Sequence, residues 1–364
     1  MKVRPTMSTV FGAPGRYVQG AGELGRLGEH VSSLGCAAFV ILDSGADDRL
    51  GGTLGPAFFA CENLVEPCFE VYDGPCTEQA VIRLAERCEA GDCDVVVGIG
   101  GGKMLDIAKA VAHFAERPLC VVPTAASTDA PCSALSVLYR EDGAFDRYLH
   151  LDRNPDVVVA DTSVIAKAPL RMTVAGMGDA LATYFEARVC ASAGGVNELG
   201  GKPGAMALAA ARACFDTLME HGLEAKRDIE AGTMTVAVER IVECNILLSG
   251  IGFESGGLVL AHAIANGLAG APRCRAMHGE AVAFGLNVQL ALEDAPEREQ
   301  VLDFCRKLGL PTTLDELGLG EISDADLLGV AEAAFQNKRN MANEQIKVTG
   351  PELVQMMREG QFGA

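Results

Sequence analysis

Short, continuous runs of apolar residues recur along the first part of the chain, and helical spacing of apolar positions follows most of them. Strands that are buried on both faces have near-continuous Val, Ile and Leu, whereas strands with one wet face alternate. The runs therefore predict a parallel sheet covered by helices on both faces, a doubly wound, Rossmann-like α/β domain. The predicted strands are Ala37–Asp43, Cys68–Tyr72, Cys93–Gly98, Leu119–Pro123 and Val157–Ala160.

After about Asp161 the strand signals stop, and apolar residues recur at the spacing of amphipathic helices. We therefore expect a Rossmann-like domain at residues 1–163 and an all-helical domain at residues 164–364. A cleft between two domains is the usual place for a ligand. The predicted helices are Thr173–Ala193, Ala205–Glu220, Met234–Ser249, Gly257–Ala269, Glu280–Leu292, Glu297–Leu308 and Asp324–Gln336.

The amino-acid composition disfavours some classes of binding partner. The 364 residues include 30 Lys and Arg against 49 Asp and Glu, a net charge of −19. That balance disfavours nucleic acid and anionic membranes, which both need a basic footprint. The 13 cysteines are an odd number without a C-x-x-C pair, which is typical of free thiols in a reducing compartment. Because no signal peptide or long apolar span is evident, we expect a cytoplasmic protein.

A glycine-rich turn joins the third predicted strand to a helix. Gly100, Gly101 and Gly102 have no side chains to keep a ligand away, and the following helix N-terminus favours negative charge. Lys103 adds a positive charge, and Asp106 is placed to cap the helix or accept a ligand hydroxyl. The spacing matches neither the usual dinucleotide fingerprint nor a Walker A motif. The turn predicts a phosphate cradle; a ligand-free turn is the alternative.

Asp43 ends the first predicted strand. In dinucleotide-binding domains an acidic residue at a strand's carboxyl end accepts hydrogen bonds from the ribose hydroxyls and repels a 2′-phosphate. This interpretation predicts NAD rather than NADP as the cofactor. An ordinary loop aspartate explains the position equally well.

A hydroxyl-rich loop follows the fourth predicted strand, on the same edge of the sheet as the glycine turn. It carries Thr124, Ser127 and Ser133, whose hydroxyls suit phosphate, ribose or carboxamide, and Asp129, which suits a polyol substrate. A loop that only caps neighbouring backbone groups is the alternative.

Two histidines and one aspartate in the helical half form a candidate metal site. His262 lies among apolar residues, His278 precedes a glycine at a predicted helix start, and Asp179 lies early in an apolar helix. Singly, each has a structural explanation as a core histidine or a helix-end charge. Together they offer three ligands and an open position, the pattern of catalytic zinc, although the same donors suit iron.

These segments together resemble the glycerol dehydrogenase family of the iron-containing (group III) alcohol dehydrogenase superfamily. The similarity runs from about Gly12 to at least Leu292, with six motifs in the family's order. The motifs are Gly98–Lys103 with Asp106 and Lys109, Ala126–Val137, Gly178–Thr183, Gly252–Gly257, Ala261–Ala263 and His278–Gly285.

The resemblance implies a Rossmann-like domain, a helical domain in the arrangement that dehydroquinate synthases share, and NAD with a divalent metal, often zinc, in the cleft. It also implies a homo-oligomer, commonly an octamer. By position, Asp179, His262 and His278 match the metal ligands and Asp129 matches the substrate-binding aspartate. Asp43 corresponds to the ribose contact. The cofactor-binding positions matched are Gly102, Lys103, Asp106, Thr124, Ser127, Ser133, Leu135 and Tyr139.

Four residues depart from the family's usual pattern. Met104 replaces a Thr after the lysine of the glycine turn, and Ala265 replaces a frequent further His. Met277 replaces an aromatic or polar residue, and Ala281 replaces a common Lys. The first bears on phosphate binding, and the others bear on substrate preference and proton relay.

The expected activity is reversible oxidation of glycerol, or a related small vicinal diol, to a hydroxyketone with NAD as hydride acceptor. A lyase of the dehydroquinate synthase type and a glycerol-phosphate dehydrogenase are alternatives on the same fold. Both need a basic pocket for a substrate phosphate, and the predicted site segments carry few Lys or Arg apart from Lys103 and Lys109. A non-enzymatic oligomer is the third alternative, against which the intact Asp, His and His set argues.

Overall fold

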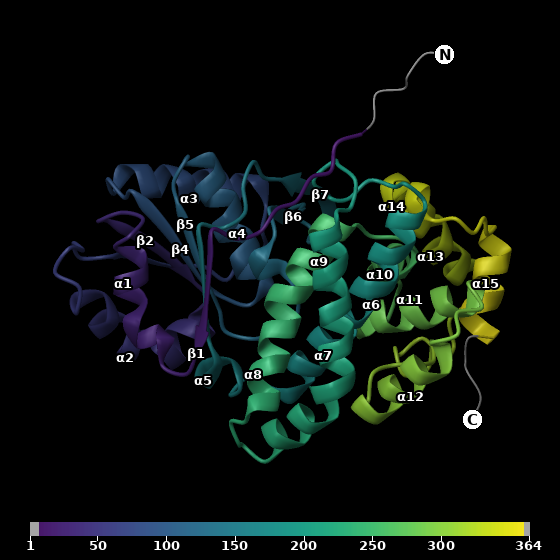
Figure 1. Cartoon of the computed structure of the whole chain (residues 1–364). Helices are drawn as coiled ribbons and strands as arrows, with labels where there is room; N and C mark the ends of the chain where they lie inside the picture. The colour runs from purple at the N-terminus through teal and green to yellow at the C-terminus, as the bar shows by residue number, and fades with distance from the viewer. Residues whose placement is uncertain (1–6, 360–364) are drawn as a thin grey trace. The chain divides into compact units, whose positions relative to one another are not determined.

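The computed structural model describes residues 7–359, which divide into two compact units. One unit is Gly12–Pro169, and the other comprises the described residues of Met1–Phe11 and Leu170–Ala364. The first is drawn in purple to blue in Figure 1, and the second mainly in teal to yellow.

A six-stranded parallel sheet forms the centre of the first unit, as the apolar runs predict. Val95, Val96 and Val97 are all fully buried, so both faces of this strand are covered. In spatial order the strands are β1 (Arg16–Gly20), β8 (Val157–Asp161), β5 (Leu119–Pro123), β4 (Val95–Gly100), β2 (Ala38–Leu42) and β3 (Cys68–Val71).

Helices cover the sheet and connect its strands. Leu42, Val97 and Ile99 on one face pack in a common core with Leu54 and Phe58. The helices of this unit are α1 (Leu27–Val31), α2 (Ser44–Phe59), α3 (Glu78–Ala90), α4 (Gly102–Phe114) and α5 (Thr162–Ile165), with short 3-10 turns at Glu23–Arg26 and Ala130–Cys132.

The order in which successive strands are added to the sheet reverses between the neighbouring strands β2 and β4. β2 leads outward to β3, whereas β4, its other neighbour, leads to β5 on the opposite side. Ligands of open α/β sheets bind beyond the carboxyl ends of the strands at such a switch point. The switch point here is flanked by the residues after Leu42 and after Gly100.

Two features of this unit go beyond the sequence prediction. β1 was not predicted, because it is a partly exposed edge strand with few apolar residues. The antiparallel hairpin of β6 (Leu135–Tyr139) and β7 (Phe145–His150) was not predicted either. Its outward-facing second strand lacks the continuous apolar run that marks the central strands.

The second unit is helical, as predicted, apart from an isolated bridge between Thr9 and Lys202. One predicted helix, Met234–Ser249, is instead a continuous assembly of α8, a π-helical turn at Cys244–Leu248 and α9, which ends at Gly256. The helices are α6 (Leu170–Ser192), α7 (Ala205–Glu230), α8 (Val236–Glu243), α9 (Ser249–Gly256), α10 (Leu260–Ala269), α11 (His278–Leu292), α12 (Arg298–Leu308), α13 (Asp324–Gln336), α14 (Lys338–Asn343) and α15 (Gly350–Glu359).

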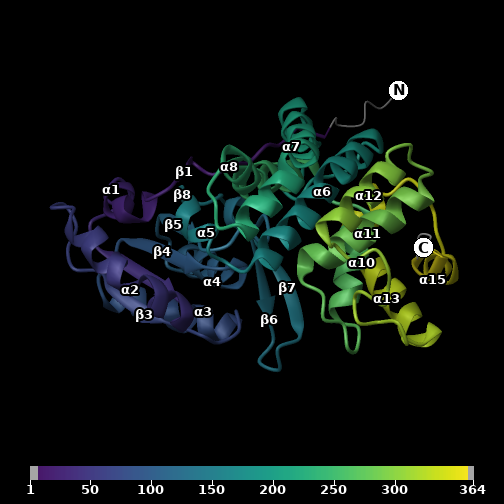
Figure 2. The ribbon, with the colours of Figure 1, turned by 90° about the horizontal axis from the view of Figure 1, so that it is seen from below.

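These helices form two neighbouring groups. α7 packs against α6 and along the continuous helix of α8 and α9, whose two segments follow one another end to end beside α7 in Figure 1. α10 packs against α11 and α13, as Figure 2 shows from another side. Because α11 also packs against α6, residues from the two groups meet along α6.

Candidate functional site

The structure brings Asp43 and the glycine turn together at the switch point of the sheet. Asp43 is the N-cap of α2, where its Oδ1 accepts the Ala46 N–H at 2.7 Å. Its Oδ2 faces the turn, since a Cβ added at Gly100 would lie 3.1 Å from it. One carboxylate oxygen therefore caps a helix while the other faces the predicted ligand position.

The glycine turn has the geometry that a phosphate cradle needs. Gly100 ends β4 with a φ of 157°, Gly101 is the N-cap of α4 and Gly102 is its first residue. A Cβ at Gly101 would meet no described atom within 4 Å, so the backbone there is open to a ligand. Lys103 is exposed, and its Nζ donates to the Asp73 carbonyl at 3.3 Å.

The hydroxyl-rich loop starts beside this turn. The Thr124 N–H donates to the Gly100 carbonyl at 3.0 Å, which joins the loop to the end of β4. Thr124 and Ser127 are half-buried, and Asp129 is buried at the start of the Ala130–Cys132 turn. The predicted loop residues therefore share one edge of the sheet with the glycine turn.

Several predicted cofactor residues are tied into a buried network around Lys109. The Lys109 ammonium pairs with Asp106 at 2.9 Å and donates to the Leu135 carbonyl. Ser133 is 3.5 Å from the same ammonium and donates to the Ala130 carbonyl. Burial and the nearby Asp106 carboxylate raise the pKa of Tyr139. Asp106, Ser133 and Leu135 thus shape the loop through contacts within the unit.

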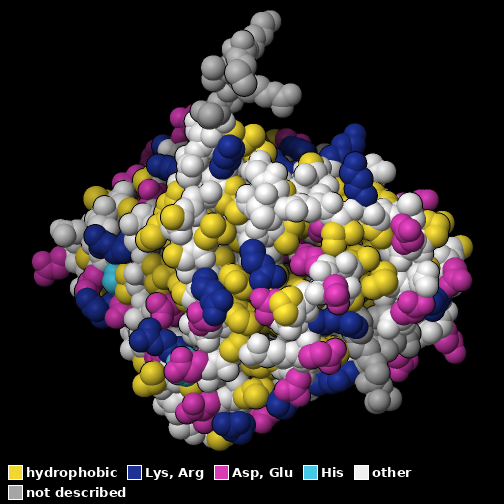
Figure 3. Space-filling view, turned by 45° about the vertical axis from the view of Figure 1, so that its right-hand side comes forward, with side chains coloured by type: hydrophobic (Ala, Val, Ile, Leu, Met, Phe, Trp, Pro, Cys, Tyr) yellow, Lys and Arg dark blue, Asp and Glu magenta, His cyan; other side chains and the backbone are white. Residues whose placement is uncertain are grey.

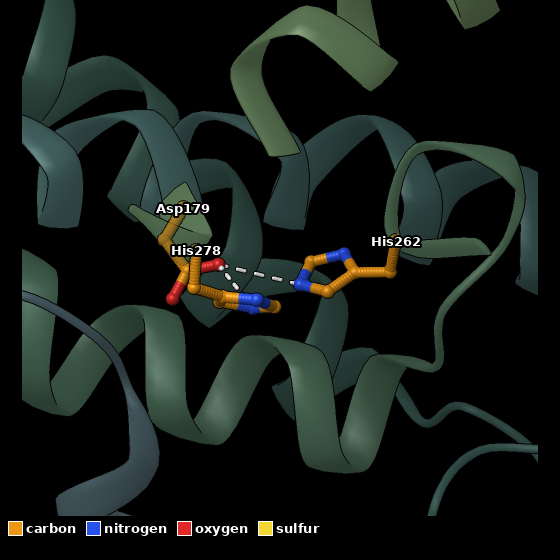
Figure 4. Close-up of side chains that lie close together, drawn as sticks. All are labelled: Asp179, His262 and His278. Carbon is orange, nitrogen blue, oxygen red and sulfur yellow. Dashed lines mark ion pairs between the residues drawn. The ribbon is translucent and has the colours of Figure 1, made fainter. Parts of the chain in front are cut away.

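The second unit brings together Asp179, His262 and His278, which are far apart in sequence. Asp179 Oδ1 lies 3.3 Å from His262 Nε2 and 3.4 Å from His278 Nε2. The three ligand atoms lie within 4.8 Å of one another, and Figure 4 shows them converging from α6, α10 and α11. Asp179 and His262 are buried, whereas the His278 side chain is 44% exposed. The site is therefore open on the side of His278.

Glycines allow the three helices to approach closely at this point. A Cβ at Gly178 would collide with the carbonyl of Gly279, and one at Gly279 with the carbonyl of Ala175 in α6. A Cβ at Gly285 would likewise collide with the Ala261 carbonyl in α10. The contact between Gly178 and Gly279 places Asp179 next to His278, because each is the chain neighbour of one of these glycines. The contact between Gly285 and Ala261 places α11 next to His262, which follows Ala261.

The electrostatics of the trio suit a cation. Burial by itself raises the pKa of Asp179, but the His278 and His262 imidazoles outweigh it and hold that pKa well below the ordinary value. Burial lowers the pKa of His262, yet the Glu186 and Asp179 carboxylates together raise it. The raised pKa of His262 reports the negative field of these two carboxylates, which a divalent ion beside the ring would also experience.

The Asp179 carboxylate supports the metal interpretation directly. It is 1% exposed, and neither oxygen makes a hydrogen bond of ordinary geometry among the described residues. An unsatisfied buried carboxylate is costly unless a cation compensates it. One carboxylate and two imidazoles are a donor set that zinc and iron both accept.

Glu186 and Arg171 also support the histidines, and neither was predicted from the sequence. Glu186, on α6, is fully buried with its Oε2 2.5 Å from His262 Nδ1. Arg171 donates from two nitrogens to the Glu280 carboxylate, which also accepts the Met277 N–H and so fixes the start of α11 at His278. The signal for Glu186 was its place seven residues after Asp179, two turns along one helix face.

The residues that depart from the family pattern lie close to these groups. Ala265 is buried in α10, one turn after His262, and Ala281 is buried in α11, one turn after His278. Met104 is buried against Gly100, and Met277 is the N-cap of α11. These four positions therefore carry only methyl and thioether groups.

Comparison with known proteins agrees with the class that this fold and donor set define, the metal-dependent alcohol dehydrogenases of the iron-containing type. The family model described as "Iron-containing alcohol dehydrogenase" matches residues 14–162. A glycerol dehydrogenase of Thermotoga maritima is 49% identical over 349 residues, covering 95% of this chain and 94% of that protein. One of Escherichia coli O6:H1 is 45% identical, covering 93% and 92%.

A solved structure agrees with these sequences. The crystal structure of a probable glycerol dehydrogenase from Sinorhizobium meliloti 1021 matches with a TM-score of 0.90 at 39% identity, and covers 96% of this chain and 97% of that one. The chain belongs to the glycerol dehydrogenase family within the iron-containing alcohol dehydrogenase superfamily. The expected family and fold class are confirmed, and the chain is an oxidoreductase of a family that implies NAD and a metal.

One face of the molecule carries charges of both signs. On the face drawn in Figure 3, Lys and Arg side chains are interspersed with Asp and Glu among the described residues. Within residues 7–359 no single helix is long and apolar enough to cross a membrane. The segments Val236–Gly256 and Leu260–Ala269 pass that test of length and composition only as a pair, and they are bent by 106°.

Proposed function

We propose that this protein oxidises glycerol, or a closely related small vicinal diol, reversibly to a hydroxyketone with NAD as hydride acceptor. The observation that carries the proposal is the convergence of Asp179, His262 and His278 in a chain 49% identical to a glycerol dehydrogenase. The glycerol dehydrogenase from Escherichia coli O6:H1 adds support at 45% identity.

Asp179, His262 and His278 would hold the divalent metal, for which we propose zinc. A bound divalent cation lowers the pKa of a coordinated hydroxyl, as zinc lowers that of water from about 16 to about 7. The half-exposed His278 leaves one side of the trio open to a substrate. Asp129 would orient the substrate by accepting a hydrogen bond from a hydroxyl. Bound NAD would supply the hydride acceptor for the carbon-bound hydrogen, and water would take the hydroxyl proton.

The sheet unit would bind the dinucleotide. The N–H groups at Gly101 and Gly102 and the α4 N-terminus favour the pyrophosphate, and Lys103 adds positive charge. Asp43 would accept the ribose hydroxyls with the oxygen that does not cap α2. Thr124, Ser127 and Ser133 would supply hydroxyls, while Asp106, Leu135 and Tyr139 complete the loop that positions the nicotinamide.

The alternatives that require a substrate phosphate are not favoured. Arg171 approaches the start of α11, but its Nε and Nη2 already donate to the Glu280 carboxylate. The two most similar relatives described above carry the name glycerol dehydrogenase rather than a synthase or phosphate-dehydrogenase name.

The His278→Ala variant tests the assignment. We expect glycerol-dependent NADH formation to fall by at least about 100-fold, since changing even an outer partner of a metal ligand commonly costs 10–100-fold. Metal content after dialysis should fall in parallel, while NAD binding persists. The control is His221→Ala, which removes a half-buried histidine from α7 in the same unit. A fully active His278→Ala protein would contradict the proposal.

We also propose a cytoplasmic homo-oligomer, with an octamer as the expected assembly, as the family resemblance implies. Light scattering on the purified protein tests the assembly, and an octamer would have a mass of about eight chains. A monomer at working concentration would contradict it.

A further inference from the structure

A buried carboxylate outside the proposed ligand trio contacts one of its histidines. Glu186 is fully buried, and its Oε2 lies 2.5 Å from His262 Nδ1. Its other oxygen, Oε1, accepts the N–H of Val259 at 2.9 Å and of His262 at 3.1 Å. Both oxygens are therefore committed to α10 and the residue before it.

The two carboxylates on either side of His262 come from one helix. Asp179 and Glu186 are both on α6, seven residues apart, and side chains two turns apart lie on the same face. Asp179 Oδ1 lies 3.3 Å from Nε2, and Glu186 Oε2 contacts Nδ1. The imidazole thus lies between two acidic groups with one ring nitrogen directed at each.

We propose that Glu186 is a positioning residue for the metal site. By accepting a hydrogen bond from Nδ1–H, Glu186 selects the tautomer of His262 in which the Nε2 lone pair faces Asp179 and His278. A metal-binding histidine needs this tautomer, and a partner on the opposite nitrogen sets both the proton position and the ring orientation. The inference rests on the metal site proposed above.

Gln289 allows a positioning role of Glu186 to be distinguished from a helix-capping role. Gln289 on α11 is fully buried, and its Oε1 accepts the Ala261 N–H at 3.0 Å. Gln289 and Glu186 therefore both satisfy backbone donors at the start of α10. Of the two, Glu186 is the one with a bond to the His262 ring. A purely structural role for Glu186 would make the two residues equivalent.

The Glu186→Gln variant has a specific effect on the tautomer. Because two backbone N–H groups occupy Oε1, the amide oxygen of the variant takes that position and the NH₂ group turns toward His262 Nδ1. Nδ1 must then accept, so the ring proton moves to Nε2 and the lone pair directed at the metal site is lost. The volume of the side chain is nearly unchanged.

The experiment measures zinc affinity on metal-stripped full-length protein by competition with a chromogenic chelator. We expect the zinc Kd of Glu186→Gln to rise about 10–100-fold over wild type. The visible absorption of the cobalt(II)-loaded protein should change as well, because it reports the ligands directly. For Gln289→Ala we expect a lower melting temperature but a zinc Kd within about threefold of wild type.

Three outcomes would overturn the proposal. A zinc Kd and cobalt spectrum unchanged in Glu186→Gln would show that the ring needs no such partner. An equal loss of zinc affinity in Gln289→Ala would show that Glu186 acts only as a helix cap. A wild type that binds no zinc or cobalt would overturn the metal site itself, which distinguishes that failure from the other two. If Glu186→Gln does not fold by circular dichroism, Glu186→Asp, whose shorter chain withdraws from Nδ1, takes its place with the same expectation.

Discussion

Single side chains at the ends of strands and helices carry most of the proposed chemistry. Asp43 combines two roles, because one oxygen caps α2 and the other faces Gly100. His278 begins α11, where Glu280 and Arg171 fix the first turn. Such positions place a polar group at a defined point without interrupting the hydrogen bonds of the element.

The double role of Asp43 predicts the coenzyme preference of a variant. Asn caps a helix as well as Asp does, so Asp43→Asn should fold normally while losing the charge that repels a 2′-phosphate. We expect the ratio of kcat/KM for NADP to that for NAD to rise about tenfold, close to 1.4 kcal/mol. Steady-state kinetics with both coenzymes measure it. Asp47→Asn, which removes an exposed charge from the same helix, should leave the ratio unchanged.

The sequence singled out the three residues of the proposed metal site but not a residue that supports one of them. Asp179, His262 and His278 are unusual residue types in apolar, glycine-flanked segments, so their chemistry stood out, and the structure places them together. Glu186 was missed because a glutamate in a long helix usually faces water. Its place seven residues after Asp179 is a weak signal, and the tertiary contact with His262 is what distinguishes it from a surface residue.

At the scale of elements, close helix contacts hold the candidate site together. α6 and α11 meet through Gly178 and Gly279, and α10 and α11 meet at Gly285. A side chain at any of these positions would collide with backbone of the neighbouring helix. The spacing of the helices, and therefore of the ligand atoms, depends on these glycines.

The Gly279→Ala variant tests the dependence on close packing. Its Cβ would collide with the Ala175 carbonyl, so α11 must shift away from α6. We expect the free energy of unfolding to fall by about 1–3 kcal/mol, the usual cost of overpacking. Zinc affinity should fall too, because His278 begins the shifted helix. Urea unfolding and chelator competition measure the two effects.

A matched glycine provides the control for Gly279→Ala. Gly329 lies inside α13, and a Cβ there would meet no described atom within 4 Å. Gly329→Ala should therefore stabilise the protein by about 0.5–1 kcal/mol, because alanine loses less backbone entropy in a helix. Equal effects of the two substitutions would contradict the packing argument.

The elements that could be predicted from sequence are those with a strong periodic signal. Leu119–Pro123 and Asp324–Gln336 have the predicted bounds, because continuous burial or a capped amphipathic face defines them. β1 and the hairpin of β6 and β7 were missed, since partly exposed strands give a weak pattern. The π-helical turn after Glu243 was missed because helical spacing continues through it.

At the scale of the whole molecule, acidic groups outnumber basic ones and several are buried. The net charge is −19. Burial raises the pKa of Glu293, at the end of α11, from its ordinary value of 4.5 to about 7. Its Oε1 accepts from Gln289 Nε2 at 2.7 Å, which offsets only part of the cost of burial.

The raised pKa of Glu293 predicts how stability depends on pH. The folded state holds this proton more tightly than the unfolded state, so its contribution to stability is full below about pH 4.5 and is lost as the pH rises through about 7. The Glu293→Gln variant has no carboxyl proton to lose, so this loss of stability at high pH is absent from it. We expect the melting temperature of the variant to exceed that of wild type by a few degrees at pH 8 and to be nearly equal at pH 5. A difference that is the same at both pH values would contradict this assignment.

We propose that a metal held by Asp179, His262 and His278 supports NAD-dependent oxidation of glycerol. The most direct measurement is NADH formation with glycerol, followed by absorbance, on metal-stripped protein and again after zinc is restored, with iron(II) as a parallel arm. We expect no NADH from the stripped protein and recovery of NADH formation when zinc is added. Full activity of the stripped protein, or no activity with either metal while NAD still binds, would contradict it.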